Sequence, residues 1–323
     1  MDEFQFIESI KPIYYKQPSL IKGVGDDAAV IRNTSEDMVT SVDVFVEGVH
    51  FTKQTMRPYH VGYRALAANI SDLAAMGALP AFYLVAVTIP KTWHPSEVRE
   101  VYDGMAELAK MFKMDLIGGD TVSGKSFSLS ITVMGYVEKD KARYRSHAKP
   151  EDIVFVTGTL GDSQAGLYIL QHPEGEYNNK DYFIKRHQMP SPRVSFSQNL
   201  HSIKRIALND ISDGIANESR EIAKASGVSI VIDEKHLPIH ESIQQFPQSL
   251  NTKWKLFGGE DFELLGTVAP DEWHHVKQAS NNAKVKVTAI GKVIISETKD
   301  TVFMHTNHDK IVELESKGYT HLK

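Results

Sequence analysis

Five acidic clusters along the chain each place a carboxylate beside Gly, Ser or Thr, at an expected strand end or turn. They are Gly25-Asp26-Asp27, Ser41-Val42-Asp43, Ser71-Asp72, Gly118-Gly119-Asp120-Thr121 and Asp210-Ile211-Ser212-Asp213-Gly214. A fold that brings several carboxylates together must overcome their mutual repulsion and their lost hydration. Mg²⁺ offsets both effects, because it takes oxygen ligands together with substrate phosphates. The clusters therefore predict a metal-dependent phosphoryl-transfer enzyme.

The composition is that of a globular protein with 323 residues, enough for two domains with cores of their own. Its 36 basic and 41 acidic residues give a net charge of −5 without a basic block, which argues against a nucleic-acid partner. The absence of cysteine excludes disulfides, thiolate metal sites and a cysteine nucleophile. The first residues lack the features of a signal peptide, and the longest apolar stretch, 81–89, is far shorter than the ~20 residues of a membrane helix. We expect a cytoplasmic protein without a membrane partner.

Hydrophobic periodicity predicts two mixed α/β halves of similar size. In the first half we expect helices at 4–14, 59–76 and 95–112, and strands at 28–31, 38–46, 80–89, 114–117 and 127–137. Asn69 and Asp72 would share one face of the second helix. A charge-dense stretch at 139–150 predicts a junction between domains 1–140 and 150–323. In the second half we expect helices at 161–170, 214–226 and 270–281, with strands at 152–157, 206–211, 228–232, 286–294 and after 258–261.

The segment Gly119–Ser126 matches the phosphate-loop pattern G-x-x-x-x-G-K-[ST] letter for letter. That motif requires a helix to begin at its Lys-Ser end, so that the helix amides hold the phosphates. Here the following residues, 127–133, alternate apolar and hydroxyl side chains, which is typical of a strand. We therefore predict a turn at Gly118-Gly119 and a hairpin-type turn at 123–126, and we keep a phosphate loop as the alternative.

Seven segments, in order along nearly the whole chain, resemble the thiamine-monophosphate kinase family. They are 25–29, 43–51, 69–77, 118–121, 156–163, 211–214 and 258–264. This family belongs to an ATP-binding superfamily that also includes aminoimidazole ribonucleotide synthetase. The resemblance implies an α/β fold with mixed sheets, in which two N-terminal domains pair into a dimeric β-barrel and each carries a C-terminal α/β domain. It also implies ATP-dependent phosphorylation of thiamine monophosphate to thiamine diphosphate by a homodimer that uses several Mg²⁺ ions.

The resemblance assigns roles to individual positions. Mg²⁺ would be held by Asp27, Ser41, Val42, Asp43, Asp72, Asp120, Asp210 and Asp213. The carboxylates that would act in catalysis through the metal are Asp27, Asp43, Asp72, Asp120 and Asp210. ATP would be contacted by Tyr102, Gly119, Asp120, Arg145 and Ser212, and thiamine monophosphate by His50, Glu260 and Tyr319.

Four positions depart from the family pattern. Val42 stands where Thr is usual, so a contact there must come from its backbone carbonyl, and His147 stands where Gly is usual. Asn209 and Ile215 are milder changes on either side of the Asp-Ile-Ser-Asp-Gly segment. These departures bear on the fine geometry of the site.

The expected chemistry suits these residues. Thiamine monophosphate brings a phosphate oxygen as its nucleophile, which is largely deprotonated at neutral pH because its second pKa lies near ~6. No general base is then required, and we expect direct in-line transfer without a phosphoenzyme. The aromatic ring of Tyr319 and the carboxylate of Glu260 suit the thiazolium cation, and the planar fork of Arg145 suits a phosphate.

Taken singly, each assigned residue also has an ordinary structural role. Asp213 is suited to capping the following helix, Asp72 to a solvated helix face, and Tyr102 to core packing. His50 alone suits a partly buried histidine, Tyr319 terminal packing, and Arg145 a surface charge. Two other functions remain alternatives for the whole chain: an aminoimidazole ribonucleotide synthetase-like enzyme and a non-catalytic nucleotide-binding relative. An acidic calcium-binding protein is excluded, because no loop resembles the EF-hand ligand spacing.

Overall fold

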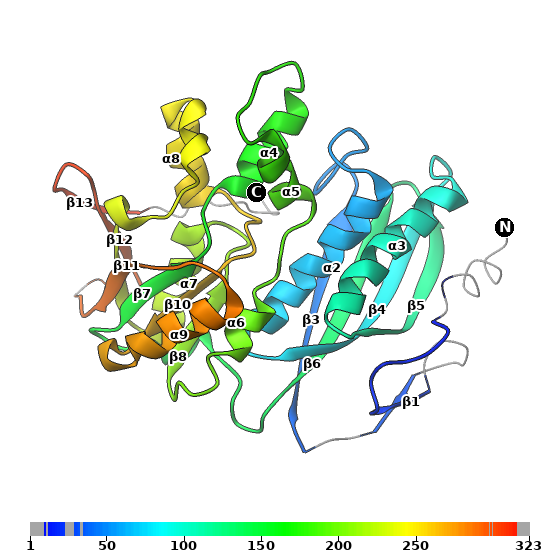
Figure 1. The fold of residues 1–323 in the computed structure, drawn as a ribbon, viewed down its shortest axis with the longest axis horizontal. Coiled ribbons are helices and arrows are strands. Elements are labelled where there is room, and N and C mark those ends of the chain that lie inside the picture. The colour runs from blue at the N-terminus through cyan, green and yellow to red at the C-terminus, as the bar shows by residue number, and fades with distance from the viewer. Residues whose placement is uncertain are drawn as a thin grey trace. The chain divides into compact units, whose positions relative to one another are not determined.

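The computed structural model describes residues 10, 12–22, 29–32, 35–296, 298 and 300–314 (Figure 1). The chain divides into two compact units, and each is described by itself. Unit 1 comprises residues 1–73 and 78–142, and unit 2 comprises residues 74–77 and 143–323. Most of the predicted helix at 4–14, together with Asp27 and Tyr319, lies outside the described residues. No described helix is long and apolar enough to cross a membrane.

Unit 1 is built on a four-stranded sheet with two helices on one face (Figure 1). Its strands, in spatial order, are β3 (Asp37–Val46), β6 (Ser128–Val137), β4 (Leu79–Pro90) and β5 (Asp115–Gly124). The helices are α2 (Pro58–Ala75) and α3 (Pro95–Met111). The predictions of these strands and helices are confirmed to within a few residues, except for the far end of β5.

Alternation along β6 shows how the sheet faces are specified. Its odd-numbered residues, from Leu129 to Val137, are buried, and its even-numbered residues are half-buried. Since successive strand residues point to opposite faces, the buried set lies on the face that α2 and α3 cover. On the other face a short pair, β1 (Leu20–Lys22) and β2 (Val30–Ile31), packs near Phe82.

The predicted turn at Gly118-Gly119 is wrong, because β5 continues through both glycines and ends at Gly124. Gly119 lies beside Val85 of β4, and a Cβ atom there would meet the Val85 carbonyl oxygen at 2.0 Å. These glycines therefore permit close strand pairing and do not reverse the chain.

The residues at 123–126 do connect two strands, but the predicted hairpin is wrong. β5 pairs with β4 in parallel, and β6 pairs with β4 and β3, so β4 lies between the two connected strands. A strand follows Lys125, as predicted, and no helix begins there. The structural context of a phosphate loop is therefore missing at this segment.

Unit 2 contains, among its described residues, a seven-stranded sheet with one parallel pair, β12 with β9. Its strands, in spatial order, are β13 (Ile311–Glu313), β12 (Val302–His305), β9 (Ser229–Asp233), β11 (Val287–Ile294), β7 (Ile153–Thr157), β10 (Leu264–Val268) and β8 (Ile206–Asp210). Its α-helices are α4 (Asp162–Gln171), α5 (Lys180–Gln188), α6 (Val194–Gln198), α7 (Ile215–Ser226), α8 (Gln248–Phe257) and α9 (Trp273–Ala283). Its 3₁₀ helices are η1 (Arg145–His147), η2 (Glu234–His236), η3 (Glu241–Gln245) and η4 (Pro270–Glu272).

The core of unit 2 lies on both faces of this sheet. Phe155 and Leu208 pack with α6 and α9 on one face, whereas Val154 and Val156 pack with α7 on the other. A separate apolar cluster joins α4 and α5 to α8 through Trp254. All predicted elements of this half are confirmed, while α5, α6, α8, β12 and β13 were not predicted.

Candidate functional site

In unit 1, one corner between β3 and α2 collects three of the predicted metal ligands. The Ser41 hydroxyl donates a hydrogen bond of 2.5 Å to the Asp72 carboxylate. The Asp43 amide donates to Oδ1 of Asn69 over 3.1 Å. Asn69 and Asp72 therefore share a helix face, as their spacing predicts, and this face meets alternate residues of β3. Because Asp72 accepts this hydrogen bond from a strand residue, it is not simply a solvated residue on the helix surface.

Two opposing effects act on the Asp43 carboxyl group. Partial loss of hydration raises the pKa of Asp43, and the nearby His50 imidazole lowers it. Nδ1 of His50 accepts a hydrogen bond of 3.0 Å from the Val46 amide, and its ring lies 5.1 Å from the ring of Phe45. His50 is thereby oriented by the strand that carries Asp43.

Val42 and Asp120 lie elsewhere on the sheet. The side chain of Val42 is 57% exposed and, by strand alternation, points away from Asp43. Asp120 is exposed and accepts a hydrogen bond of 2.9 Å from the Thr121 amide. Strand register aligns Asp120 with Ala86 on the face that the helices do not cover, whereas Asp43 aligns with buried Ile131. Asp43 and Asp120 therefore point to opposite faces of one sheet.

Tyr102 is a core residue of α3, with only 6% of its surface exposed. Burial raises the pKa of its hydroxyl, and the neighbouring Tyr83 adds to this effect. This placement favours the packing role over a contact with ATP. The ATP contact stays a prediction.

In unit 2, two motif loops are held together by backbone hydrogen bonds. The Glu260 amide donates to the Ser212 carbonyl over 2.7 Å, and the Phe262 amide donates to the Ile211 carbonyl over 3.0 Å. Gly214 ends the first loop with φ of +94°, a conformation that favours glycine. The N-cap position of α7 is Gly214, and Asp213 lies one residue before it. The paired loops bring Ser212, Asp213 and Glu260 to one edge of the sheet.

A hollow of about 270 Å³ lies beside this edge. It brings together three predicted residues, Arg145, Ser212 and Asp213, and it is also lined by Asn217, Glu218, Arg220 and Glu221. Nε of Arg145 donates to Oδ1 of Asn209 over 2.8 Å, so the arginine is more than a surface charge. Asp210 is buried at the end of β8.

Glu218 also lines this hollow, and the sequence patterns did not indicate it. Its carboxylate accepts hydrogen bonds from the Asp213 amide over 3.0 Å, from the Ser212 hydroxyl over 3.2 Å and from the Asn209 amide group. Burial raises the pKa of Glu218 to about 7, against the hydrogen bond from the Asp213 amide, which lowers it. The one available signal was its place on the apolar face of α7, where a carboxylate is unusual.

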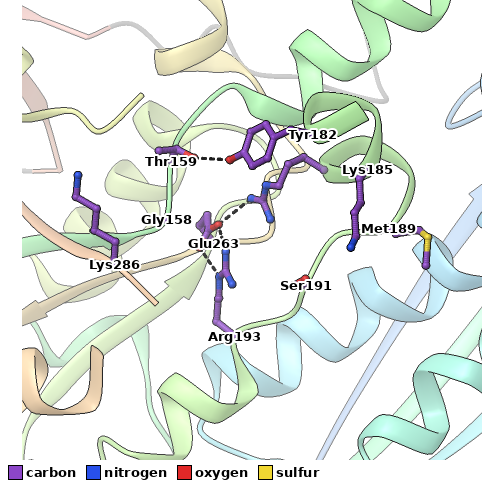
Figure 2. A pocket seen from close by; sticks show the side chains of 10 residues that line it. Gly158, Thr159, Tyr182, Lys185, Met189, Ser191, Arg193, Glu263 and Lys286 are labelled. Carbon is purple, nitrogen blue, oxygen red and sulfur yellow. Dashed lines mark hydrogen bonds and ion pairs between the residues drawn. The ribbon is translucent and has the colours of Figure 1, made fainter. Parts of the chain in front are cut away.

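A larger cavity of about 430 Å³ in unit 2 contains none of the predicted site residues (Figure 2). Glu263 lies on its wall and is fully buried between two arginines. Arg186 donates to this carboxylate over 2.7 Å, Nε of Arg193 does so over 2.5 Å, and the Thr157 hydroxyl donates over 2.6 Å. Burial alone would raise the pKa of Glu263, but Arg193 and Arg186 hold it below its ordinary value. Arg186 also donates to the Asp261 carbonyl over 3.1 Å and pairs with Asp162 at 3.6 Å. Because both arginines are engaged by groups of the protein itself, we interpret this group as a structural clamp.

Asp261 has a structural role as well. Its buried carboxylate accepts hydrogen bonds from the amides of Gly161, over 2.6 Å, and Ser163, over 3.1 Å, at the start of α4. Burial raises the pKa of Asp261 to about 7, and the nearby Asp162 charge adds to the rise. The Gly-Gly-Glu-Asp-Phe-Glu segment is thus divided, with Glu260 at the loop edge and its two other carboxylates inside the fold.

The described part of the chain holds no group of three or more His, Asp or Glu side chains arranged to bind a metal ion. Asp43, Asp72 and Asp120 belong to unit 1, whereas Asp210 and Asp213 belong to unit 2. The donor chemistry nevertheless suits Mg²⁺, since Ser41, Asp43 and Asp72 present only oxygen atoms. A cation near Asp43 would also offset the lost hydration that raises its pKa.

Comparisons with known proteins agree with this arrangement of two units. Residues 25–137 match the N-terminal domain model of AIR synthase related proteins, and residues 149–302 match the C-terminal domain model. The chain is 47% identical to the thiamine-monophosphate kinase of Bacillus subtilis over 328 residues, which cover 100% of both chains. The chain belongs to the thiamine-monophosphate kinase family.

Two solved structures of the thiamine-monophosphate kinase family resemble the whole fold. The enzyme from Stenotrophomonas maltophilia K279a matches with a TM-score of 0.84 and 30% identity, covering 95% of this chain and 97% of that one. AaThiL complexed with AMPPCP and TMP matches with a TM-score of 0.78 and 32% identity, covering 93% and 92%. The mixed α/β fold expected from the sequence is therefore confirmed.

Proposed function

We propose that this protein is a kinase that transfers a phosphoryl group from ATP to thiamine monophosphate and forms thiamine diphosphate. The observation that carries this conclusion is the 47% identity, over the full length of both chains, with a thiamine-monophosphate kinase. The resemblance to AaThiL, which was solved with AMPPCP and TMP, supports both substrates. An aminoimidazole ribonucleotide synthetase-like activity has no comparable support.

We further propose that Mg²⁺ binds the oxygen ligands that the family pattern assigns within each unit. Ser41, Asp43 and Asp72 would supply oxygen atoms in unit 1, and Asp210 and Asp213 would do so in unit 2, with Asp27, Asp120 and the Val42 carbonyl completing the predicted set. When bound, the ions supply positive charge that bridges protein carboxylates and phosphate oxygens.

The side chains of the chain itself would orient the substrates. Arg145, held by Asn209, would direct its remaining guanidinium donors at ATP phosphate from the hollow, beside the Ser212 hydroxyl. His50, Glu260 and Tyr319 would hold thiamine monophosphate, in accordance with the family pattern. The acceptor phosphate is already ionised at neutral pH, so the transfer needs no protein base and proceeds directly between the two phosphates.

We also propose that the protein acts as a homodimer through the face of the unit 1 sheet that α2 and α3 leave uncovered. Val42 and Val44 of β3 and Val122 of β5 are about half exposed on this face. The three valines lie on the two edge strands of the sheet, and pairing two sheets through this face would bury them. Asp120 lies on the same face, so it would be at the interface. The cytoplasmic location stays a prediction.

The decisive experiment is a ³¹P NMR time course of the purified protein with Mg-ATP and thiamine monophosphate. We expect thiamine diphosphate and ADP to appear, and EDTA or Asp120→Asn to abolish their formation. Folded protein that binds ATP but forms no diphosphate would refute the substrate assignment. A phosphoprotein formed from γ-labelled ATP and stable to acid would refute direct transfer.

A further inference from the structure

A line of directed hydrogen bonds runs beneath the hollow of unit 2 and joins three of its predicted ligand-binding residues. Glu218, with 4% of its surface exposed, is the common acceptor for Asn209, Ser212 and Asp213. Asn209 in turn accepts from Arg145. One buried carboxylate therefore links the guanidinium group on η1 to the loop that precedes α7. We call this series of hydrogen bonds, from Arg145 through Asn209 and Glu218 to the Ser212–Asp213 turn, the relay.

The direction of every bond in this line is determined by chemistry. The guanidinium group of Arg145 can only donate, so Asn209 must turn its carbonyl oxygen toward it. The amide group of Asn209 must then face Glu218, which has to accept. The Asp213 backbone N–H donates to the same carboxylate from the other side. An acceptor is required at position 218, and a residue that accepts on one side and donates on the other is required at position 209.

Other contacts leave the Arg145 side chain weakly oriented. The backbone of η1 is attached to α7, because the Ser226 hydroxyl donates to the Arg145 carbonyl over 2.8 Å. The nearest carboxylate apart from this line is Glu221, at 4.0 Å, and both side chains of that pair are 49% exposed. An exposed pair at this distance contributes little. Asn209 therefore makes the short contact that selects the direction of the guanidinium group.

We propose that Glu218 and Asn209 are positioning residues that hold Arg145 and the Ser212–Asp213 turn in one arrangement for binding the phosphates of a nucleotide. This inference rests on the proposed function of the hollow, and it adds two residues to it. It would act on nucleotide affinity and leave the affinity for thiamine monophosphate unchanged.

The test exchanges the side-chain amide of Asn209 and the carboxylate of Glu218 between the two positions. E218Q places an amide donor against the Asn209 donor, and N209D places a second carboxylate against Glu218, so each single variant breaks the line. In the double variant N209D/E218Q, the new amide at position 218 donates to the new carboxylate at position 209, which also accepts from Arg145. The carbonyl oxygen of that amide still accepts from Ser212 and Asp213. The double variant also keeps the net charge of the wild type.

We expect each single variant to raise the KM for ATP about tenfold, the effect of one lost hydrogen bond to a charged group, with little change in the KM for thiamine monophosphate. The double variant should return to within about twofold of the wild type. The matched control N199D/E272Q, in which both residues lie outside the hollow, should leave both constants unchanged. Calorimetry with Mg-ADP should show the same pattern of affinities.

A double variant that folds but keeps a tenfold higher KM for ATP would overturn the relay, as would single variants with a KM equal to that of the wild type. If a single variant does not fold, recovery of both the fold and the KM in the double variant supports the relay. If the wild type forms no thiamine diphosphate, the proposed function fails. The relay is then decided by the Mg-ADP affinities of the same variants.

Discussion

Replacing Glu263 by glutamine tests the interpretation that this buried carboxylate is a structural clamp. The substitution keeps the shape of the side chain but removes the carboxylate that pairs with both Arg186 and Arg193. Arg186 keeps only its longer contact with the Asp162 carboxylate, at 3.6 Å. Both arginine side chains are only 12% and 16% exposed, so water screens their charges weakly. Removing one partner of a buried ion pair costs about 3–5 kcal/mol, which is a large part of the ~5–15 kcal/mol that stabilises a typical protein.

The loss should appear in the unfolding transition of unit 2. For a domain of this size a loss of 1 kcal/mol lowers Tm by about 2–4 °C, so E263Q should lower it by about 10 °C. Differential scanning calorimetry and urea unfolding would measure the shift. E272Q is the matched control, because Glu272 pairs with His275 at a more exposed position and should lose only about 0.5 kcal/mol or less. A loss below about 1 kcal/mol in E263Q would refute the clamp.

Three further predictions follow from the same structure. The pKa of Asp261 is raised to about 7 in the folded state, above its value of about 4 in the unfolded chain. Between these two values the folded protein keeps a proton on Asp261 that the unfolded chain has lost, so this group reduces the free energy of unfolding as pH rises from about 4 to about 7. In urea unfolding, the free energy of unfolding of D261N should lack this pH dependence, which is at most about 1.4 kcal/mol per pH unit. A variant whose free energy of unfolding depends on pH as in the wild type would contradict the prediction. K125A should keep most of the kinase activity in a coupled ADP assay, and a loss as large as that of D120N would restore the phosphate-loop interpretation. V44E should shift the protein from dimer to monomer in analytical ultracentrifugation, and a dimer with unchanged affinity would exclude the uncovered sheet face as the interface.

Local sequence patterns determined most of the regular structure. The helix at 59–76 and the strand at 38–46 have clear periodicity, and they correspond to α2 and β3. α5 was missed because it is short and mostly polar, and only Phe183 and His187 along it are buried. The Gly118-Gly119 turn was wrong for another reason, since a glycine pair looks the same in a turn and in a strand. Close approach to Val85 of β4 distinguishes the two, and that contact is non-local.

The sequence by itself also determined the family, because seven motifs in order carry that information without coordinates. Tertiary structure decided which side chains meet. Strand register sends Asp43 and Asp120 to opposite faces of one sheet, and the pairing of two loops brings Ser212 to Glu260. The role of Glu218 depends on a partner nine positions earlier in the chain, Asn209, and on Arg145, which comes from a distant segment. Periodicity specifies which face a residue takes, but hydrogen-bond partners far apart in sequence are set only when the sheet and helices pack.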